Sequence, residues 1–504
     1  MKISNIKGGL VLSYAALIIN ALINIIYTPL LLRYLGTSEY GLYSLSVSTA
    51  GYLSVLSFGF VNAYIRYYYK YKVENDEKKI ADLNGMYLFV FMIIGVVSFV
   101  VGIIIVTNVE RFFGESLTFE ELAKAKVLIQ ILVVNISLTF PLSIFGFYLT
   151  AIEKFIFMKS ISLIQSVLTP CIMIFVLMLG YRSVGLTIVI LVVNITLHLA
   201  HLYYCCVRCG YKMSFKISNF IMFKEIAVFS TYIFFNILAE QLKYNAGKII
   251  LGRYQGTTDV AIFGIGVQIY LIFLLLSSNI TSVFKPRVNE LVLSNKKNEL
   301  DELFIRIGRI QSIVLFLVLA GFIFLGRQFI FFWVGEEFYD SYAIALLLII
   351  PLTLSQVQIL STEIQRARNL HKFRSVLLFI VAIANVVASV FLSQKYSGIG
   401  CAIAIAITVL IGNVIIMGIY NQRVIGLNIS GLFKSISSFI PAMIPSIITG
   451  IIIIRFINLE SPVIFVLSGI VFTCIYCGSM WILGLNEYEK NLIRKPVLML
   501  LKRH

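Results

Sequence analysis

Long runs of apolar residues, separated by short polar stretches, recur along the whole chain. A membrane-crossing helix needs about 20 predominantly apolar residues, and the runs predict about fourteen such helices. Strands of about ten residues with alternating hydrophobicity, which are typical of membrane β-barrels, do not occur in the sequence. The chain is therefore predicted to be an all-α polytopic membrane protein. The predicted helices cover residues 8–32, 40–65, 85–107, 123–152, 157–180, 185–207, 224–251, 259–284, 306–326, 341–366, 373–394, 398–421, 435–456 and 462–485.

A short motif between the first two apolar runs returns between the seventh and the eighth. Residues 33–43 read RYLGTSEYGLY and residues 253–263 read RYQGTTDVAIF, with Arg, Tyr, Gly and Thr identical at matching places. A weaker match joins residues 157–160 to residues 373–375. Each half then contains six predicted helices, an even number, so both halves face the same way. We expect a pseudo-twofold axis along the membrane normal.

The duplication predicts four parts of the chain. They are an N-terminal six-helix lobe (1–215), a C-terminal six-helix lobe (220–425), two additional helices (435–485) and a basic cytoplasmic tail (486–504). Membrane proteins with two such halves usually bind their substrate at the interface between them. This organisation is typical of a transporter.

Composition and charge support a membrane protein. Hydrophobic residues make up 59% of the chain and charged residues 13%, which excludes an ordinary soluble domain. The net charge of +17 does not indicate nucleic-acid binding, because about three quarters of the Lys and Arg residues fall at the helix ends and loops that this topology places inside. The same bias predicts that both termini lie in the cytoplasm. The first apolar run is too long for a signal-peptide core, so we expect it to be retained.

Sequence motifs for catalysis or metal binding are missing. The seven cysteines do not form a disulfide framework, and Cys474 and Cys477 share an apolar helix without further ligands. The sequence contains no phosphate-binding Walker motif, zinc-protease motif or nucleophile elbow. We therefore expect no cofactor, no metal and no enzymatic activity.

Four segments together resemble a known family. They are residues 27–43, Gly59-Phe60 with Arg66, residues 331–342, and residues 367–375 followed by Ala384-Asn385. In order and spacing they are similar to bacterial O-antigen and capsular polysaccharide flippases, which are polysaccharide-type members of the multidrug/oligosaccharidyl-lipid/polysaccharide (MOP) exporter superfamily.

The resemblance covers most of the first 430 residues and implies a two-lobed, V-shaped bundle in the bacterial cytoplasmic (inner) membrane. Such a bundle moves undecaprenyl-pyrophosphate-linked oligosaccharides to the outer leaflet for O-antigen, capsule or exopolysaccharide assembly, with polysaccharide polymerase machinery as a partner. Family members often carry an acidic residue where this chain has Ser57 and Gly247. An ion site built on those acids is therefore not assumed.

The predicted seventh helix carries the most polar residues: Asn236, Glu240, Lys243, Tyr244 and Lys248. Their spacing places the first four on one stripe, and charged side chains inside a membrane usually face a cavity or a partner. We expect both lysines to attract the pyrophosphate, the Asn and Tyr side chains to line the cavity, and the Glu to couple transport to H⁺ or Na⁺. The alternative is a structural ion pair, with Lys248 snorkelling to the interface.

The first helix offers a second polar stripe, because Asn20 and Asn24 match positions 240 and 244 of the repeat. With Thr28 they follow a helical spacing that ends at Pro29, a candidate hinge. The functional interpretation is a cavity lining, and the alternative is hydrogen bonding between helices. Arg66, beside several tyrosines, suits pyrophosphate capture at the cytoplasmic entrance or a positive-inside anchor.

The predicted tenth helix ends in a polar segment near the cytoplasmic mouth. Arg366 is a candidate substrate contact, Glu363 a candidate ion-coupling residue and Pro351 a second candidate hinge. The alternative is a solvated helix end. In the predicted sixth helix, His198 and His201 share one face, which suits either a proton relay or ordinary packing.

Three rival functions remain open. A multidrug or cation antiporter of the same superfamily would favour buried carboxylates and few lysines. A lipid II flippase would also suit fourteen helices. A membrane polysaccharide polymerase or ligase would need a sizeable outward loop, and the sequence leaves no room for one.

Overall fold

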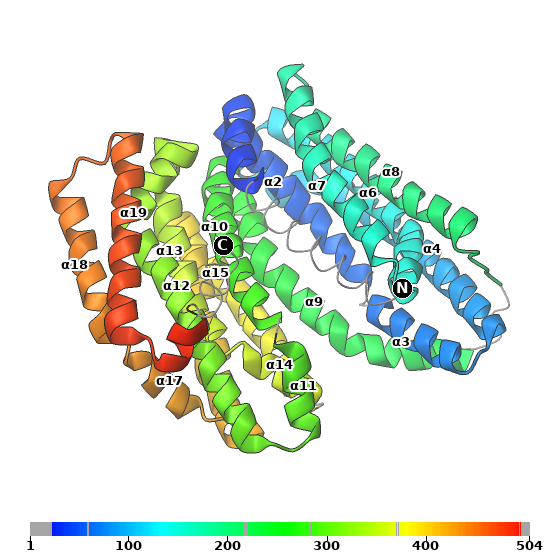
Figure 1. Ribbon diagram of the computed structural model, residues 1–504. Helices are drawn as coiled ribbons and strands as arrows, with labels where there is room; N and C mark the ends of the chain where they lie inside the picture. Colours follow the sequence, from blue (N-terminus) through cyan, green and yellow to red (C-terminus); the bar gives the residue numbers. More distant parts are fainter. Residues whose placement is uncertain are drawn as a thin grey trace, which may run out of the picture. The chain divides into compact units, whose positions relative to one another are not determined.

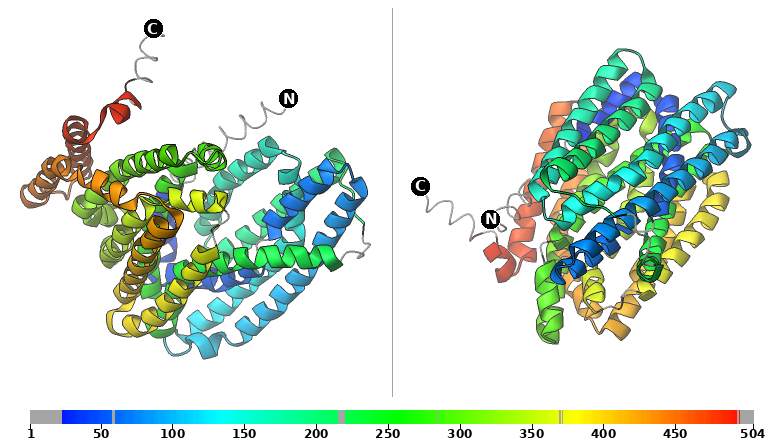
Figure 2. Two further views of the ribbon diagram at one scale, coloured as in Figure 1. Left: turned by 90° about the horizontal axis from the view of Figure 1, so that it is seen from below. Right: turned by 90° about the vertical axis from the view of Figure 1, so that its right-hand side faces the viewer.

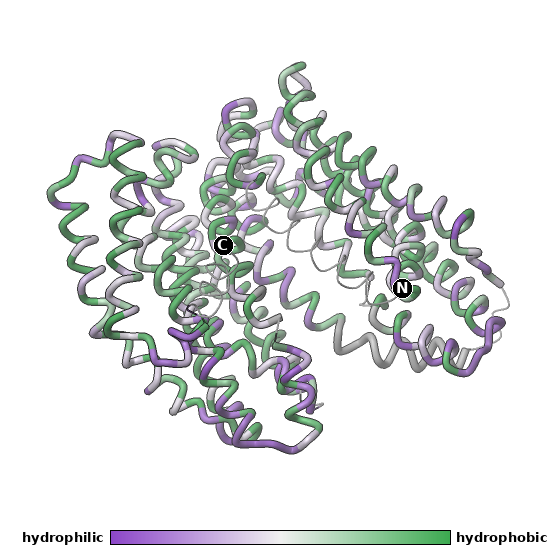
Figure 3. The backbone as a smooth tube through the Cα atoms, viewed as in Figure 1, coloured by the Kyte–Doolittle hydropathy of each residue, from purple (hydrophilic) through white to green (hydrophobic). Residues whose placement is uncertain are grey.

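The computed structural model describes residues 23–57, 60–214, 220–282, 284–368, 370, 372–492 and 494. These residues form helices with short connections, and no β-strand occurs among them (Figure 1). Long apolar stretches alternate with hydrophilic turns, such as the turn between α11 (Lys285–Leu293) and α12 (Lys297–Val334) (Figure 3). The predicted all-α polytopic membrane fold is confirmed.

The predicted number of fourteen membrane helices is not confirmed. Within the described residues, nine helices or helical runs are long and apolar enough to cross a membrane, and the bent pair Ile429–Ser437 and Ile440–Phe456 adds a tenth. The run Lys372–Ile425 counts once although its 54 residues span two predicted helices. Its only non-helical backbone is at Ser397, with φ 49° and ψ −133°.

Two predicted helices are instead broken. The predicted helix 40–65 is divided by the six-residue 3₁₀ helix Tyr52–Ser57. The predicted helix 341–366 is interrupted at residues 357–359. The 3₁₀ helix follows Gly51 directly, whereas no glycine or proline lies directly before residues 357–359. Hydrophobicity alone did not indicate either break.

The described residues divide into two compact units. Unit 1 comprises the chain up to Gly264 together with Ser393–Gly398, and unit 2 comprises the rest. The predicted lobe boundaries remain a prediction. Unit 1 contains the helix Ile23–Leu35, α2 (Thr37–Gly51), η1 (Tyr52–Ser57), α3 (Phe60–Val73), α4 (Glu77–Thr107), α5 (Val109–Phe113), α6 (Phe119–Ala151), α7 (Phe155–Met178), α8 (Arg182–Arg208), α9 (Phe220–Tyr254) and the start of α10 (Thr257–Ser282).

Unit 2 continues α10 and ends with the helices that follow the two repeats. Its elements are α11 (Lys285–Leu293), α12 (Lys297–Val334), η2 (Glu336–Phe338), α13 (Asp340–Gln356), α14 (Leu360–Ala367), most of α15 (Lys372–Val409), η3 (Leu410–Ile416), α16 (Met417–Tyr420), η4 (Asn421–Ile425), α17 (Ile429–Ser437), α18 (Ile440–Phe456), α19 (Pro462–Ser479) and η5 (Met480–Gly484).

Unit 1 is built around α6. Helices α4 and α8 pack along it, and α7 packs on α8 (Figures 1 and 2). Helix α6 begins with a capping box, in which Thr118 and Glu121 each bind the other's backbone N–H. Aromatic side chains of α3, α4 and α6 form a buried cluster that includes Tyr64, Tyr87 and Phe91.

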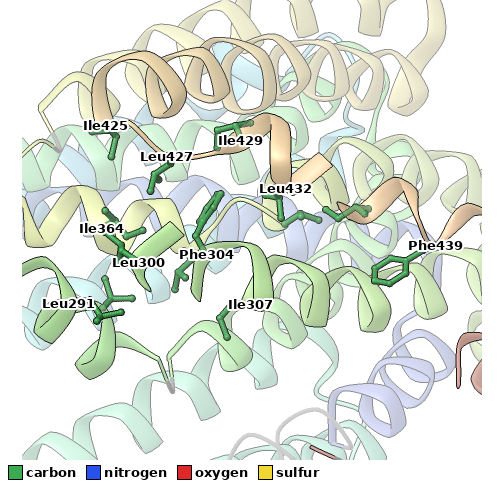
Figure 4. Close-up of a cluster of buried hydrophobic side chains, with 14 of the residues drawn as sticks. Leu291, Leu300, Phe304, Ile307, Ile364, Ile425, Leu427, Ile429, Leu432 and Phe439 are labelled. Carbon is green, nitrogen blue, oxygen red and sulfur yellow. The ribbon is translucent and has the colours of Figure 1, made fainter. Parts of the chain in front are cut away.

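Unit 2 has its largest apolar cluster where α11, α12, α14 and α17 meet (Figure 4). Phe304, Leu432 and Phe439 are fully buried there. Short α17 presents Ile429, Leu432 and Ile436 to this cluster, which is the spacing of one helical face.

A buried ion pair ties the end of the described chain to the same cluster. Arg309 Nε lies 2.6 Å from Glu489 Oε1, and both side chains are less than 10% exposed. The guanidinium also donates to the Ser435 and Gly484 backbone oxygens, at 2.6 and 3.1 Å. Residues that follow η5 are thus part of unit 2.

The duplicated motif forms the same backbone turn in both copies. Gly36 and Gly256 have φ of 78° and 97°, a conformation that favours glycine. The residue after each glycine begins a helix, α2 or α10. This shared turn explains why the glycine is identical in the two copies.

Candidate functional site

Helix α9 belongs to unit 1, and its predicted polar stripe is partly accessible. Asn236, Lys243 and Tyr244 are half-buried, whereas Glu240 is exposed. The Lys243 ammonium lies 5.2 Å from the centre of the Tyr244 ring, a cation–π contact. The ion pairs found among the described residues do not include Glu240. An ion pair between Glu240 and Lys243 is thus not found among the described residues, and the role of this stripe stays a prediction.

A second polar face of α9 was missed by the sequence analysis. Gln241 Nε2 donates to Ser54 Oγ at 3.3 Å, and Tyr52 donates from its hydroxyl to the Gln241 backbone oxygen at 3.3 Å. Asn245 donates to the Gln241 side-chain oxygen. Gln241, Asn245 and Lys248 follow the spacing i, i+4, i+7, which could have indicated this face.

Lys248 extends from this second face toward α2 and the start of α10. A Cβ placed on Gly264 would lie 3.7 Å from Lys248 Cε and 3.4 Å from Ser44 Oγ. Lys248 is half-buried, and its ammonium forms no hydrogen bond or ion pair with any residue that the structure describes. An unpaired cation among apolar helices is costly, so this position suits an anionic ligand.

Lys243 and Lys248 lie on different faces of α9. They are five positions apart, so their directions around α9 differ by about 140°. Lys243 lies with Tyr244, whereas Lys248 shares its face with Gln241 and Asn245. The prediction that both lysines contact one pyrophosphate remains untested.

The polar stripe of the first helix is only partly described, because Asn20 lies outside the described residues. Asn24 is exposed, whereas Thr28 is buried and donates to the Asn24 backbone oxygen at 2.8 Å. The helix Ile23–Leu35 passes through Pro29 without interruption. Asn24 and Thr28 thus have different surroundings despite their helical spacing.

Arg66 and its neighbouring tyrosines also differ in their surroundings. Arg66 is exposed on α3, whereas Tyr64 is fully buried and donates to Asn84 Oδ1 at 2.6 Å. Asn84 in turn donates to the Lys212 backbone oxygen at 2.7 Å. Tyr64 therefore helps to hold α3 and the segment after α8 on α4, and does not form a shared site with Arg66.

In unit 2, the candidate ion-coupling residue Glu363 is already paired. Its Oε1 lies 3.1 Å from Lys285 Nζ and 3.0 Å from Arg366, whose side chain is mostly exposed. Pro351 lies within α13, and the break to α14 comes later, at residues 357–359. Two cations thus surround the one carboxylate at this end of unit 2.

The acid of the duplicated motif, Glu39, has four polar contacts in unit 1. Glu39 Oε1 accepts from the Ser183 backbone N–H at 3.1 Å and from its hydroxyl at 2.6 Å. Glu39 Oε2 lies 3.2 Å from both Lys124 and Arg182. Burial raises the pKa of Glu39, but the Ser183 hydrogen bonds and Lys124 together hold this pKa below its ordinary value of 4.5.

The second copy repeats this contact in a reduced form. Asp259, the counterpart of Glu39, accepts a hydrogen bond from the Ser397 hydroxyl. Arg182 and Ser397 both have positive φ, 46° and 49°. Each follows a tyrosine, in the matching segments YRSVG (181–185) and YSGIG (396–400). The motif acid thus binds the start of the last helix of its own half in both copies.

Comparison with known proteins identifies the family. The chain matches the family described as "Polysaccharide biosynthesis protein" over residues 6–292, more than half of its length. No match is found among curated protein sequences.

Several solved structures share the fold. One is the lipid II flippase MurJ in an inward closed conformation, with a TM-score of 0.72 at 18% identity over 94% of this chain and 98% of that one. Another is an inward-facing multidrug resistance MATE family transporter of the MOP superfamily, with a TM-score of 0.67 at 13% identity over 83% and 99%. A MOP superfamily transporter from Pyrococcus furiosus has a TM-score of 0.51 at 14% identity over 85% and 95%.

At these identities the structural likeness shows the fold, which is that of membrane transporters. The multi-pass membrane prediction is therefore confirmed. The predicted resemblance to a polysaccharide family is confirmed by the family match. The chain belongs to the polysaccharide biosynthesis protein family.

Proposed function

We propose that the protein moves undecaprenyl-pyrophosphate-linked oligosaccharide units from the cytoplasmic to the outer leaflet of a bacterial cytoplasmic membrane. Both termini lie in the cytoplasm, and the two halves expose the substrate site alternately. Family membership supports a role in polysaccharide biosynthesis, and the fold supports transport. The observation that carries the proposal is the ammonium of Lys248, which lies on a polar face of unit 1 and has no partner among the described residues.

The chemistry of this face suits a phosphorylated sugar lipid. Moving a pyrophosphate through hydrocarbon unaided is prohibitive, because even one unpaired ion costs far more than thermal energy. Lys248 offers a positive charge, and Gln241 and Asn245 offer amide groups that hydrogen-bond phosphate or sugar oxygens. The polyprenyl tail remains in the lipid. Lys243 and Arg66 supply further positive charge along the path.

Coupling to H⁺ or Na⁺ is part of the proposal. Glu240 is the better candidate for it, because Glu363 is already neutralised by Lys285 and Arg366. One charge that crosses about 100 mV supplies about 2.3 kcal/mol. This energy is sufficient to bias the transport cycle.

Lipid II transport is the second candidate, and the likeness to MurJ over nearly the full length of both chains favours it. Its cargo would use the same cationic face, because both cargoes carry a polyprenyl pyrophosphate. A multidrug antiporter is less well supported, since an unpaired lysine repels organic cations.

A deletion strain tests the proposal. We expect lipid-linked oligosaccharide to accumulate on the cytoplasmic leaflet and surface polysaccharide to be lost. The wild type and Lys248→Arg should restore both, whereas Lys248→Ala and Lys243→Ala should not. Lys212→Ala is the matched control, because Lys212 is exposed and paired with Glu77.

Other outcomes separate the candidates. Normal surface polysaccharide with accumulated lipid II would favour the second function. Normal amounts of both, with increased sensitivity to cationic drugs, would overturn the proposal in favour of an antiporter. Full activity of Lys248→Ala at normal expression would remove Lys248 from the substrate path.

A further inference from the structure

Helices α6, α7 and α8 pack against one another in unit 1 (Figure 1). Polar side chains run through this packing. Gln165 of α7 donates to Asn194 Oδ1 of α8 at 3.0 Å. Asn194 donates to Asn135 Oδ1 of α6 at 3.4 Å. His198 and His201 follow Asn194 on the same face of α8, one and two turns further along. We call these five residues the histidine seam.

The hydrogen bonds of the seam stop at the two histidines. Their ring centres are 6.1 Å apart. Nδ1 of His198 and both ring nitrogens of His201 are buried, and none has a hydrogen-bond partner among the described residues. A neutral imidazole carries one donor and one acceptor, and burying either unpaired costs about 1–3 kcal/mol. Ordinary packing does not account for two neighbouring histidines with buried, unpaired ring nitrogens.

The neighbours of His201 pack around its ring but form no hydrogen bond with its nitrogens. Gly146 of α6 has no side chain, and a Cβ there would lie 3.7 Å from His201 Nδ1. The Phe157 ring of α7 lies 6.2 Å from the His201 ring and stacks on Tyr204 of α8 at 3.8 Å. Aromatic packing, rather than polar bonding, holds α7 on α8 at this point.

The stretches of α6 and α7 that face the seam provide no negative charge for a protonated histidine. In the facing stretches, residues 127–151 of α6 and 155–178 of α7, there is no carboxylate. Glu153, between these two helices, accepts a hydrogen bond from the Tyr69 hydroxyl at 2.9 Å. Glu39 is the only acid of α2, and its carboxylate binds Arg182 and Ser183 at the far end of α8. The titratable or charged groups on these elements are otherwise Tyr40 and Tyr43 of α2, Glu120, Glu121, Lys124, Lys126 and Tyr148 of α6, Lys159 and Cys171 of α7, and Arg182, Tyr203, Tyr204, Cys205, Cys206 and Arg208 of α8.

We propose that His198 and His201 form a proton-sensitive switch in unit 1. With both rings neutral, α7 packs against α6 and α8. A proton on either ring places a positive charge without a counter-charge in the closed seam, so protonation favours a state in which α7 separates from α8 and water reaches the ring. Helix α7 is the least buried of the candidate membrane spans. Pro170 within it removes one backbone hydrogen bond of the helix.

Hydrogen exchange of the full chain in lipid nanodiscs tests the switch. Exchange is measured near pH 7.5 and near pH 6, and is corrected for the pH dependence of the chemical step. We expect peptides of α7 to open faster at the lower pH, by up to about tenfold per pH unit for one linked proton. Peptides of α4 should not change and serve as the internal reference.

Two double variants complete the experiment, because the chain has four histidines. His198→Phe/His201→Phe keeps rings of similar size that never carry charge, and it should lose the acceleration. His371→Phe/His504→Phe removes the other two histidines and should retain it. If the first variant does not fold, His198→Gln/His201→Gln, which is neutral at every pH, should show the same loss.

Two results would overturn the switch. One is a wild-type protein whose α7 opens equally fast at both pH values. The other is an acceleration that persists when both seam histidines are replaced. The experiment contains no cargo, so its outcome is independent of the transport test above.

Discussion

The two copies of the duplicated motif form the same backbone turn, but the acid of the first copy has more polar contacts than the acid of the second. Glu39 is buried between Lys124 and Arg182 and also binds the backbone and the hydroxyl of Ser183. Asp259 is half-buried, and the contact found for it is the Ser397 hydroxyl. After duplication, the turn and the helix contact were kept, whereas the surrounding charges diverged.

The close approach of helices also differs between the copies. Gly41 of α2 lies so near α10 that a Cβ there would be 1.8 Å from the Thr257 backbone oxygen. Its counterpart Ala261 already has a Cβ and is fully buried. The first copy thus depends on a missing side chain at a place where the second copy does not.

The largest expected effect is that of Gly41→Ala. The new methyl group overlaps the Thr257 carbonyl, so α2 must move away from α10, at a cost of about 3 kcal/mol. Thermal unfolding of the purified protein in nanodiscs measures this loss. Ala261→Gly, at the matching place, should cost only about 1 kcal/mol. Equal losses in the two variants would contradict the asymmetry.

Removing the acids should have the next largest effect. Glu39→Gln leaves Lys124 and Arg182 without their carboxylate and should lower the free energy of unfolding by about 2 kcal/mol. Asp259→Asn loses one charge-assisted hydrogen bond and should cost about 1 kcal/mol or less. Denaturation of both variants under the same conditions compares them. A greater loss for Asp259→Asn would reverse the comparison.

The shared turn should give equal effects in the two copies. Gly36→Ala and Gly256→Ala each place a Cβ on a residue with positive φ, which costs about 1 kcal/mol. Around Gly36 no atom lies within 4 Å of the new Cβ, and at Gly256 the nearest is the Ser116 oxygen at 3.4 Å. A much greater loss at either glycine would show that the two turns are not equivalent.

The smallest expected effect is the pH dependence of the stability that Glu39 contributes. Glu39 lies outside the predicted membrane segment 40–65, and its folded-state pKa is lower than in the unfolded chain. Its contribution to stability is therefore fully present above pH 4.5 and is lost as the pH falls through the lower folded-state pKa. The difference in unfolding temperature between wild type and Glu39→Gln should shrink below pH 4.5. A constant difference would contradict this assignment.

The features that the sequence predicted well depend on local patterns. Apolar runs indicated the membrane helices, and the matching letters at 33–43 and 253–263 indicated the duplication. The breaks at residues 52–57 and 357–359 were missed, because helix ends inside a bundle depend on tertiary packing.

Prediction of the candidate site was likewise limited to local patterns. Helical spacing already separates Lys248 from the stripe of Lys243, but only the structure shows the hydrogen bonds that Gln241 forms on the Lys248 face. Glu39 and Arg182 are 143 residues apart, so no local pattern indicates their contact. The histidines of α8 were noticed from their spacing, whereas their lack of partners required coordinates.

The Arg309–Glu489 pair has a consequence for biogenesis. The two residues are 180 positions apart, so the ribosome inserts α12 long before the carboxylate that neutralises Arg309 exists. A reporter fused between Gly484 and Glu489, as in topology mapping, would leave this buried guanidinium without its carboxylate. Such a fusion would report on the quality control of a misassembled membrane protein rather than on the side of the membrane at which α19 ends.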